Sequence, residues 1–271
     1  MNRVEPLPPA ADLERRFGGL RRLYGAPGYA RIRAARVAVV GLGGVGSWAV
    51  EALARSGVAQ LVLIDLDHVA ESNLNRQVQA LESTIGRHKG AALAERIAQI
   101  HPQCDVRVVD QFVDESNWPA LLPCEVDAVI DACDQVRAKT AIAAWALAGG
   151  NALVCTGAAG GKQRAQDVET GDLAAVTHDP LLAALRQRLR KQHGAPRSGP
   201  IGVDCVYSRE SVARPQVCDI DDAAIFTDGS LNCSGYGSSV AMTATFGLVA
   251  AGEVLRRCAA GQRPGSSKGP I

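Results

Sequence analysis

The stretch Val37-Ala-Val-Val-Gly41-Leu-Gly43-Gly44-Val-Gly46 decides the fold of this chain. It is an apolar run that ends in a cluster of glycines, and a second apolar run, Leu61-Val-Leu-Ile-Asp65, follows it. A strand, a glycine turn, an amphipathic helix from Val45 to about Ser56 and a second strand that ends on an acid are the parts of a nucleotide-binding βαβ unit. Asp65 lies 19 residues after Gly46, which is the spacing at which an acid accepts hydrogen bonds from a ribose.

The glycines have separate tasks in such a unit. Gly41 permits a tight exit from the strand, Gly43 lets the backbone approach a phosphate group, and Gly46 lets the helix pack closely on the sheet. Gly44 belongs to the same turn, and the amino end of the helix offers amide groups and its positive dipole end to an anion. The alternative is a glycine turn needed only for packing, but the position of Asp65 favours nucleotide binding.

Cationic residues follow the second strand, in the segment Asn73-Leu-Asn-Arg76-Gln77 and at Lys89. Hydride transfer to a nicotinamide needs no cation at the phosphates, whereas nucleotidyl transfer needs charge neutralisation at the leaving pyrophosphate. We therefore expect Asn73, Arg76 and Lys89 to contact phosphates at the carboxyl edge of the sheet. For Lys89 the alternative is a solvated position on a helix that runs to Ile100.

Two carboxylates follow another apolar strand, in Val129-Ile-Asp131-Ala-Cys-Asp134. Magnesium in nucleotide sites favours one or two carboxylates together with phosphate oxygens. Asp134 is therefore predicted to hold a divalent ion that bridges the phosphates. For Asp131 we expect a structural role instead, as the cap of a helix from Val136 to Ala148.

Together these motifs resemble the ThiF/MoeB/HesA superfamily of ubiquitin-activating-type adenylyltransferases. Three further segments, residues 16–25, 156–161 and 202–208, resemble one branch of it, the tRNA threonylcarbamoyladenosine dehydratases, so the likeness covers nearly the whole chain. It implies an α/β fold with a doubly wound, mostly parallel, Rossmann-like ATP-binding sheet. The matching motif residues are Gly41, Gly43, Gly44, Gly46, Asp65, Asn73, Arg76, Gln77, Lys89, Asp131 and Asp134.

The resemblance also implies an activity. Such an enzyme uses ATP and Mg²⁺ to adenylate the carboxylate of a threonylcarbamoyl group on an adenosine beside the anticodon of a tRNA. The activated carbon is then captured intramolecularly, which gives the cyclic, dehydrated form. By this resemblance Asp134 lies at the metal and the α-phosphate. In the superfamily an arginine near the amino end reaches into the other subunit of a homodimer; Arg16, Arg21 and Arg22 are candidates, and we expect Arg22 to act.

Two other functions share parts of these motifs. An adenylyltransferase that activates the carboxyl terminus of a ubiquitin-like sulfur-carrier protein would have the same nucleotide site, but such enzymes often carry paired Cys-x-x-Cys motifs that bind zinc. This chain has none, so we expect no zinc site. An NAD-dependent oxidoreductase would explain the glycine turn and Asp65, but would leave Arg76, Lys89 and Asp134 without a task.

The eight cysteines give a weaker signal. Most are predicted to fill apolar core positions, and Cys133 and Cys155 are examples. Cys233 lies in a glycine-rich loop before a predicted helix, where a helix amino end can lower a thiol pKa, so it is the candidate reactive or sulfur-accepting thiol. The alternative is a simple helix entry. The resemblance further suggests a cysteine desulfurase or a sulfur-acceptor protein as a partner. The cysteines are residues 104, 124, 133, 155, 205, 218, 233 and 258.

The net charge of +1 identifies no nucleic-acid partner, and the charge distribution leaves two readings, a phosphate-binding face or a solvated basic face. No acid occurs between Asp179 and Asp204, and this stretch carries five Lys or Arg residues. Leucines at helical spacing predict a helix that packs on one stripe and ends at Gly194. The basic residues that we expect to contact tRNA phosphates are Arg186, Arg188, Arg190 and Lys191.

Four regions are expected along the chain: a leader and helical arm in residues 1–35, a nucleotide-binding core in 36–157, a continuation in 158–260 that forms the substrate and dimer face, and a disordered tail in 261–271. The apolar segment 240–251 spans 12 residues, against roughly 20 for a membrane-spanning helix. We expect a buried helix there, with peripheral membrane association as the alternative. Because no targeting segment is evident, a cytoplasmic location is predicted.

Overall fold

The centre of the fold is one sheet, which has seven strands within residues 11–213 and 236–261, the part of the 271-residue chain that the computed structural model describes. The strands are β1 (Arg36–Val40), β2 (Gln60–Ile64), β3 (Asp105–Val109), β4 (Ala128–Asp131), β5 (Ala152–Thr156), β6 (Val168–Asp172) and β7 (Asp204–Ser208). Their order is β3-β2-β1-β4-β5-β7-β6, and every neighbouring pair is parallel except β6 and β7. The predicted fold class, a doubly wound and mostly parallel sheet, is confirmed.

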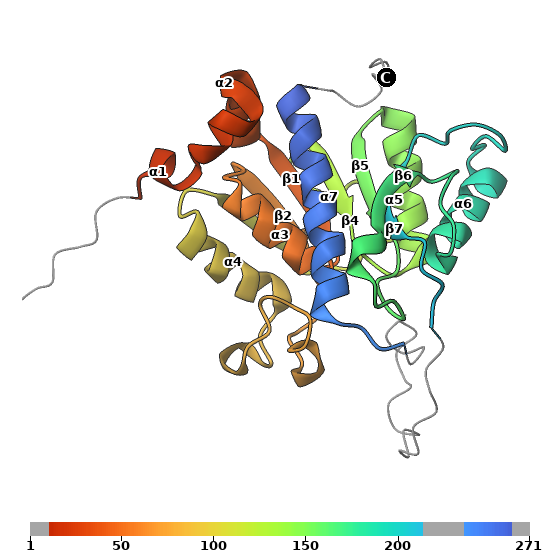
Figure 1. Ribbon diagram of the computed structural model, residues 1–271, viewed down its shortest axis with the longest axis horizontal. Coiled ribbons are helices and arrows are strands. Elements are labelled where there is room, and N and C mark those ends of the chain that lie inside the picture. The colour runs from red at the N-terminus through yellow and green to blue at the C-terminus, as the bar shows by residue number, and fades with distance from the viewer. Residues whose placement is uncertain (1–10, 214–235, 262–271) are drawn as a thin grey trace, which may run out of the picture.

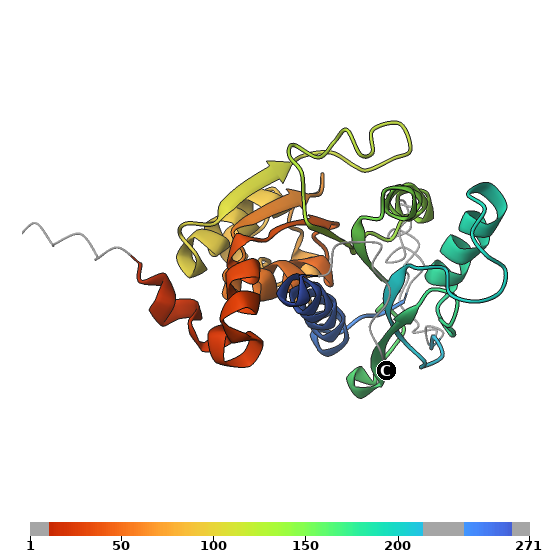
Figure 2. The ribbon, with the colours of Figure 1, turned by 90° about the horizontal axis from the view of Figure 1, so that it is seen from above.

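Helices cover both faces of this sheet (Figure 1). They are α1 (Leu13–Phe17), α2 (Gly19–Ala34), α3 (Gly46–Arg55), α4 (Lys89–Ile100), α5 (Val136–Gly149), α6 (Pro180–Gln192) and α7 (Val240–Ala260). Helices α3, α4 and α7 pack on one face, and α5 and α6 pack on the other. In Figure 2 the blue helix α7 and the green helix α5 lie on opposite sides of the strands.

The core forms two layers because successive strand residues point to opposite faces. In β1, Val37 and Val39 pack with α3 and α7, whereas Ala38 and Val40 pack with α5. All four side chains are buried. A strand that is covered on both faces must be apolar at every position, which explains the continuous apolar runs of the sequence.

The amino-terminal arm is helical, as expected for residues 12–33, but it is broken into α1 and α2 at Gly18. Phe17 is buried at this break, and the guanidinium of Arg33 lies over its ring at 5.0 Å. The Nε of Arg31 donates to the carbonyl of Ala259 at 2.9 Å, so the arm is tied to the far end of α7.

The apolar segment 240–251 is the first part of α7, which continues to Ala260. Met242, Phe246 and Ala250 are buried against the sheet and α3. The predicted buried helix is present. Among the helices that the structure describes, none is long and apolar enough to cross a membrane.

Candidate nucleotide site

A pocket of about 960 Å³ opens at the carboxyl edge of the parallel strands. It lies where the strand order reverses, because β2 and β4 flank β1 and the chain winds outward from β1 in both directions. Loops diverge at such a point, so doubly wound sheets bind their ligands there. The lining combines the ends of β1, β2, β4 and β5 with the start of α7, and includes Gly41, Gly43, Gly44, Asp65, Asn73, Arg76, Lys89 and Asp134. The structure thus brings all of these predicted residues into one pocket.

The glycine turn has the geometry that its sequence predicted. Gly41 has a φ of +85°, which side-chain-bearing residues rarely adopt. A Cβ on Gly46 would lie 1.8 Å from the carbonyl oxygen of Gly41, so the start of α3 can follow the strand this closely only with glycine there. A Cβ on Gly43 would meet nothing within 4 Å, so this part of the turn offers open space at the pocket.

Asp65 is a rigid acceptor at the end of β2. One of its carboxylate oxygens accepts from the backbone amide of Leu42 at 2.6 Å, and the other accepts from the amide of Asp67 at 2.8 Å. The residue is buried. Because each carboxylate oxygen has two acceptor positions, both can still accept a ribose hydroxyl. Asp65 therefore links the glycine turn to the predicted ribose position.

The guanidinium of Arg76 is positioned by local contacts. It donates to the carbonyl of Ser72 at 2.7 Å and to the side-chain oxygen of Asn75 at 2.9 Å. The backbone carbonyl of Arg76 accepts from the indole of Trp48 at 3.0 Å, which fixes the segment to α3. Burial lowers the pKa of Arg76. An arginine starts so far above neutrality that it keeps its charge, so the pocket wall carries a permanent cation.

Asn73 and Lys89 stand at the same wall. The side-chain oxygen of Asn73 accepts from the amide of Ala70 at 3.0 Å, which shapes the turn before Arg76. Lys89 is buried, and its ammonium lies 2.7 Å from Oδ2 of Asp67. The alternative of a solvated Lys89 on the helix surface is therefore wrong.

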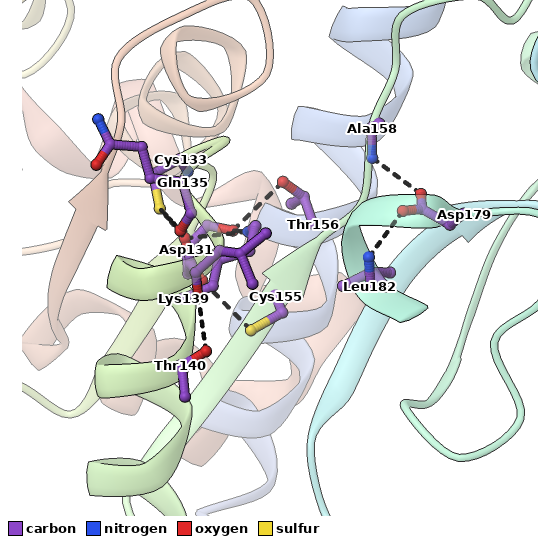
Figure 3. A network of polar contacts seen from close by, with 11 residues as sticks. Asp131, Cys133, Gln135, Lys139, Thr140, Cys155, Thr156, Ala158, Asp179 and Leu182 are labelled. Atoms are coloured by element: carbon purple, nitrogen blue, oxygen red, sulfur yellow. Dashed lines mark hydrogen bonds and ion pairs between the residues drawn. The ribbon is translucent and has the colours of Figure 1, made fainter. Parts of the chain in front are cut away.

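Asp134 lines the pocket from the turn between β4 and α5, but Asp131 does not cap α5 as expected. The capping position of α5 is Gln135, and its side chain makes no capping hydrogen bond. Asp131 is instead fully buried in an ion pair with Lys139, with 3.1 Å between Oδ1 and Nζ (Figure 3). This pair could not be predicted from the sequence, because a lysine inside a mostly apolar helix resembles a solvated residue.

The surroundings of Cys133 and Cys155 are also less apolar than expected. Their thiols donate to the two carboxylate oxygens of Asp131, at 3.0 Å and 3.5 Å (Figure 3). Burial, with Asp131 next in importance, raises the pKa of both thiols. Both are thus unreactive groups of a polar cluster. Cys218 and Cys233 lie outside the described residues.

The lining includes residues that sequence reasoning missed. Asp67, His68 and Phe112 line the pocket from the loops after β2 and β3, Tyr236 lines it just before α7, and Thr243 lines it from the first turn of α7. Asp67 had a signal, since it lies two residues beyond Asp65 at a strand end. The others had none, because their loops reach the pocket only through the tertiary fold.

The amino-terminal arginines lie away from the pocket of their own chain. Arg16 donates to the carbonyl of Ile100 at 2.6 Å, and Arg21 is paired with Glu14 at 2.9 Å. Arg22 is exposed on α2, and no residue in the described ranges pairs with it. Of the three candidates, Arg22 is the one whose charge is available to another molecule.

Helix α6 buries its leucines as predicted, but its arginines are not all exposed. Arg186 donates to the carbonyls of Leu173 and Val176 at 2.9 Å and 2.8 Å. The Nε of Arg188 is buried without a hydrogen-bond partner among the described atoms. Lys191 is exposed, and Arg190 donates to the carbonyl of Pro196 at 3.1 Å. A groove lined by Arg186, Arg190, Lys191 and Arg197 lies along this face.

Asp179 connects α6 to the pocket wall. Its carboxylate accepts from the amide of Leu182 at 3.0 Å, which caps α6, and from the amide of Ala158 at 2.9 Å (Figure 3). Ala158 lines the pocket. The side chain of Asp179 therefore joins the amino end of α6 to the wall of the pocket.

Within the described ranges, no three His, Cys, Asp or Glu residues are grouped so that they could hold a metal ion. Magnesium needs fewer protein ligands, because phosphate oxygens and water complete its shell. The carboxylate of Asp134, in a pocket that Arg76 and Lys89 also line, fits that requirement.

A model of the ThiF family matches residues 16–268. The chain belongs to the ThiF family. Among characterised relatives, the tRNA threonylcarbamoyladenosine dehydratase of Escherichia coli is 43% identical over 248 residues, which cover 89% of this chain and 92% of that protein. The Haemophilus influenzae protein of the same name is 38% identical over 90% of this chain and 93% of its own length. The family predicted from the motifs is confirmed.

Solved structures of the ThiF family agree with this assignment. The E. coli dehydratase TcdA in complex with ATP superposes with a TM-score of 0.83 at 40% identity, over 93% of this chain and 97% of that one. A complex of the same enzyme with AMP gives a TM-score of 0.82 at 41% identity, over 93% of this chain and 97% of that one. The E. coli molybdopterin-synthase adenylyltransferase is 35% identical over only 45% of this chain and 48% of that protein.

Proposed function

We propose that this protein is an ATP-dependent tRNA threonylcarbamoyladenosine dehydratase. The observation that carries the proposal is the presence of Arg76, Lys89 and Asp134 in the pocket that also contains the glycine turn and Asp65. A redox nucleotide needs no such charges at its phosphates, whereas departure of pyrophosphate does. The names of the near full-length relatives supply the substrate.

The pocket suggests how ATP is oriented. Asp65 accepts the ribose hydroxyls, the phosphates pass Gly43 where the turn is open, and Arg76 and Lys89 neutralise the phosphate charge. Asp134 would hold Mg²⁺ together with phosphate oxygens, and the ion would add positive charge at the phosphates.

The reaction then has two steps. A carboxylate oxygen of the threonylcarbamoyl group attacks the α-phosphorus, a new P–O bond forms, and the bond to pyrophosphate breaks. In the second step, a nucleophilic atom of the same modified nucleoside attacks the activated carbonyl carbon, and AMP leaves with the former carboxylate oxygen. The product is one water lighter than the substrate. Because the substrate supplies its own nucleophile, no thiol of the protein takes part in bond formation.

The size of the pocket fits two ligand groups. Its volume is near the upper end of about 300–1,000 Å³ that small-molecule sites span. Beyond the nucleotide end, the lining continues along Gly157 and Ala158 to Leu181 and Tyr236. We assign this end to the acyl group and its nucleoside.

Binding of the rest of the tRNA is assigned to the basic groove of α6. Lys191, Arg190 and Arg197 supply positive charge there, and no carboxylate lines the groove among the described residues. Arg22 is assigned to the nucleotide pocket of a second subunit in a homodimer, since its side chain is exposed and unpaired within the described part of its own chain. A sulfur-transfer partner at Cys233 and a cytoplasmic location stay predictions.

The test is mass spectrometry of nucleosides from tRNA that carries threonylcarbamoyladenosine, after incubation with the protein, Mg²⁺ and ATP. An ATP-dependent loss of one water from that nucleoside is expected. Unchanged nucleoside, with a protein that still binds ATP, would contradict the proposal and favour adenylation of a carrier-protein terminus. A parallel melting experiment should show stabilisation by ATP and not by NAD; a ligand at 100 times its Kd adds about 2.7 kcal/mol.

A further inference from the structure

Lys139 is a fully buried cation directly beneath the nucleotide pocket. It lies on the second turn of α5, and its ammonium is 3.1 Å from Oδ1 of Asp131 and 3.2 Å from the backbone oxygen of the same residue. Both side chains have 0% exposure. Burial opposes the charge, but Asp131 outweighs this effect, so the net shift raises the pKa of Lys139 and the residue stays an ammonium.

Asp131 in turn holds the first residues of the turn that follows β4. Its Oδ1 accepts from the backbone amide of Cys133 at 3.2 Å, in addition to the thiol of the same residue. Its backbone oxygen also accepts from the hydroxyl of Thr156 at 3.3 Å. Figure 3 shows these groups converging on Asp131 from β4, β5 and α5. These contacts hold the carboxylate of Asp131 in one orientation.

The same turn is in contact with the glycine turn. A Cβ on Gly41 would lie 2.8 Å from the amide nitrogen of Cys133 and 2.9 Å from the carbonyl oxygen of Ala132. The backbone after β4 therefore packs directly on the backbone after β1. Asp134 is the next residue of this turn, and it lines the pocket. Any change in the path of residues 132 and 133 must move Asp134 relative to the glycine turn.

We infer that the buried Lys139–Asp131 pair is a positioning device that sets the turn after β4 against the glycine turn and thereby places Asp134 for adenylate formation. This inference rests on the proposed function. Neither Lys139 nor Asp131 touches the pocket, so both act through the turn and not on the substrate.

The energetics favour positioning over stability as the role of the pair. Well-packed apolar groups of similar volume often stabilise a core as well as a buried ion pair does, whereas removing one partner leaves an uncompensated charge and is strongly destabilising. What an apolar substitute cannot do is hold the Cys133 amide and fix the turn. A displacement of about 1 Å in a reacting group can lower a rate about 100-fold.

The test uses the double variant Asp131→Leu with Lys139→Met, which removes both charges and also the acceptor of the Cys133 amide. Its control is Glu51→Leu with Arg96→Met, which removes another ion pair, 2.7 Å long, between the buried Glu51 of α3 and the half-buried Arg96 of α4, away from the pocket. Three quantities are measured on each: the Kd for ATP, the single-turnover rate of adenylate formation on modified tRNA, and the rate at which N-ethylmaleimide labels Cys133, mapped by peptide mass spectrometry.

The thiol of Cys133 is a native reporter, because it belongs to the turn and is held by Asp131. We expect the double variant to label at Cys133 at least 10-fold faster and to form adenylate about 100-fold more slowly, with a Kd for ATP within about threefold of the wild type. The control should change thermal stability and leave both rates at the wild-type level. Wild-type labelling and wild-type turnover in the double variant would overturn the inference.

Labelling needs no tRNA, so it separates the two proposals. If the wild type binds ATP but does not dehydrate tRNA, the proposed function fails, while faster labelling of Cys133 in the double variant still supports positioning of the turn. If the double variant does not fold, Cys155→Val and Cys155→Ser decide. The serine keeps the bond to Asp131 and the valine removes it, so slower turnover and faster labelling only in the valine variant support the inference. Equal behaviour of the two overturns it.

Discussion

The ammonium of Lys89 lies 2.7 Å from Oδ2 of Asp67, and both side chains belong to the wall of the nucleotide pocket. The cation that is assigned to phosphate is thus already paired with a carboxylate of the protein. ATP must share this lysine with Asp67 or displace it, and the negative charge of Asp67 opposes the phosphates.

Asp67→Asn is therefore expected to tighten ATP binding, whereas Lys89→Met is expected to weaken it. We expect a change of about fivefold in Kd in each direction, which corresponds to about 1 kcal/mol for a partly exposed pair. Calorimetric titration with ATP and Mg²⁺ measures both. Glu95→Gln is the control, since it removes one charge from an exposed pair with Arg87 outside the pocket. Weaker binding by Asp67→Asn would show that Asp67 orients Lys89 and does not compete with ATP.

Arg76→Ala should leave the fold intact and slow adenylate formation about 100-fold, because a positioned charge at the leaving group is lost. Among the described residues its guanidinium hydrogen-bonds only to Ser72 and Asn75, both in its own loop, so no side-chain hydrogen bond to another element is lost. Pyrophosphate release with modified tRNA is the measurement, and Arg87→Ala is the surface control. Turnover of the Arg76→Ala variant at the wild-type rate would show that Arg76 is not a catalytic residue.

Asp134→Ala should show a different signature. If Asp134 holds Mg²⁺, the rate should fall about 100-fold and its dependence on Mg²⁺ concentration should shift to higher values. Titration of the rate with Mg²⁺ at saturating ATP checks this. A lower rate with an unchanged Mg²⁺ dependence would support Asp134 as a catalytic residue but would contradict its role as a ligand of Mg²⁺.

The basic residues of α6 should divide into two groups. Lys191→Ala with Arg197→Ala should weaken tRNA binding and lower the slope of log K against log salt by about 1.5, since each lost phosphate contact accounts for about 0.7–0.9. Arg186→Ala should mainly lower the Tm, because its guanidinium bonds to two backbone carbonyls. Filter binding over a salt series, with melting curves, separates the effects. An unchanged slope in the first variant would exclude this face as the tRNA site.

His101 should make stability depend on pH. It is buried beside Phe17 and Arg33, and burial, followed by the charges of Arg33 and Arg16, lowers its pKa below the ordinary value of about 6.5. The folded protein therefore binds fewer protons than the unfolded chain just below that value. The contribution of His101 to the free energy of unfolding is fully present above about pH 6.5, and it is lost as the pH falls through the lowered pKa of the folded protein.

The variant His101→Gln should flatten this part of the pH profile. Urea unfolding between about pH 7.5 and about pH 5.5 measures the free energy of unfolding of both proteins. We expect the wild type to lose more stability than the variant over this interval. Parallel profiles would show that His101 does not contribute to the acid sensitivity.

The predicted sheet, the helix positions and the nucleotide residues followed from local patterns. A strand buried on both faces must be apolar throughout, and a turn with a φ of +85° at Gly41 needs glycine, so both leave marks in the sequence. Asp65, Arg76 and Lys89 could be placed because the carboxyl ends of parallel strands meet at one edge. The family motifs then indicated the chemistry.

Other features depended on partners that are distant in sequence. Lys139 could not be distinguished from a solvated lysine until the fold placed Asp131 beside it, and the leucine stripe of α6 did not reveal that Arg186 bonds to Leu173 and Val176. A side chain is polar or charged in the sequence, but its burial and its partners are properties of the packed molecule.

The sequence by itself determined the fold class, the glycine turn, the family and the set of charged residues now found in the pocket, because each depends on backbone constraints or on contacts a few residues apart. Only the tertiary structure decided that Asp131 is the centre of a buried polar cluster, that Asp67 is paired with Lys89, and that Tyr236 before α7 and Thr243 within it complete the pocket. The physical reason is that desolvation, ion pairing and pocket shape arise between segments that the chain brings together only when it folds.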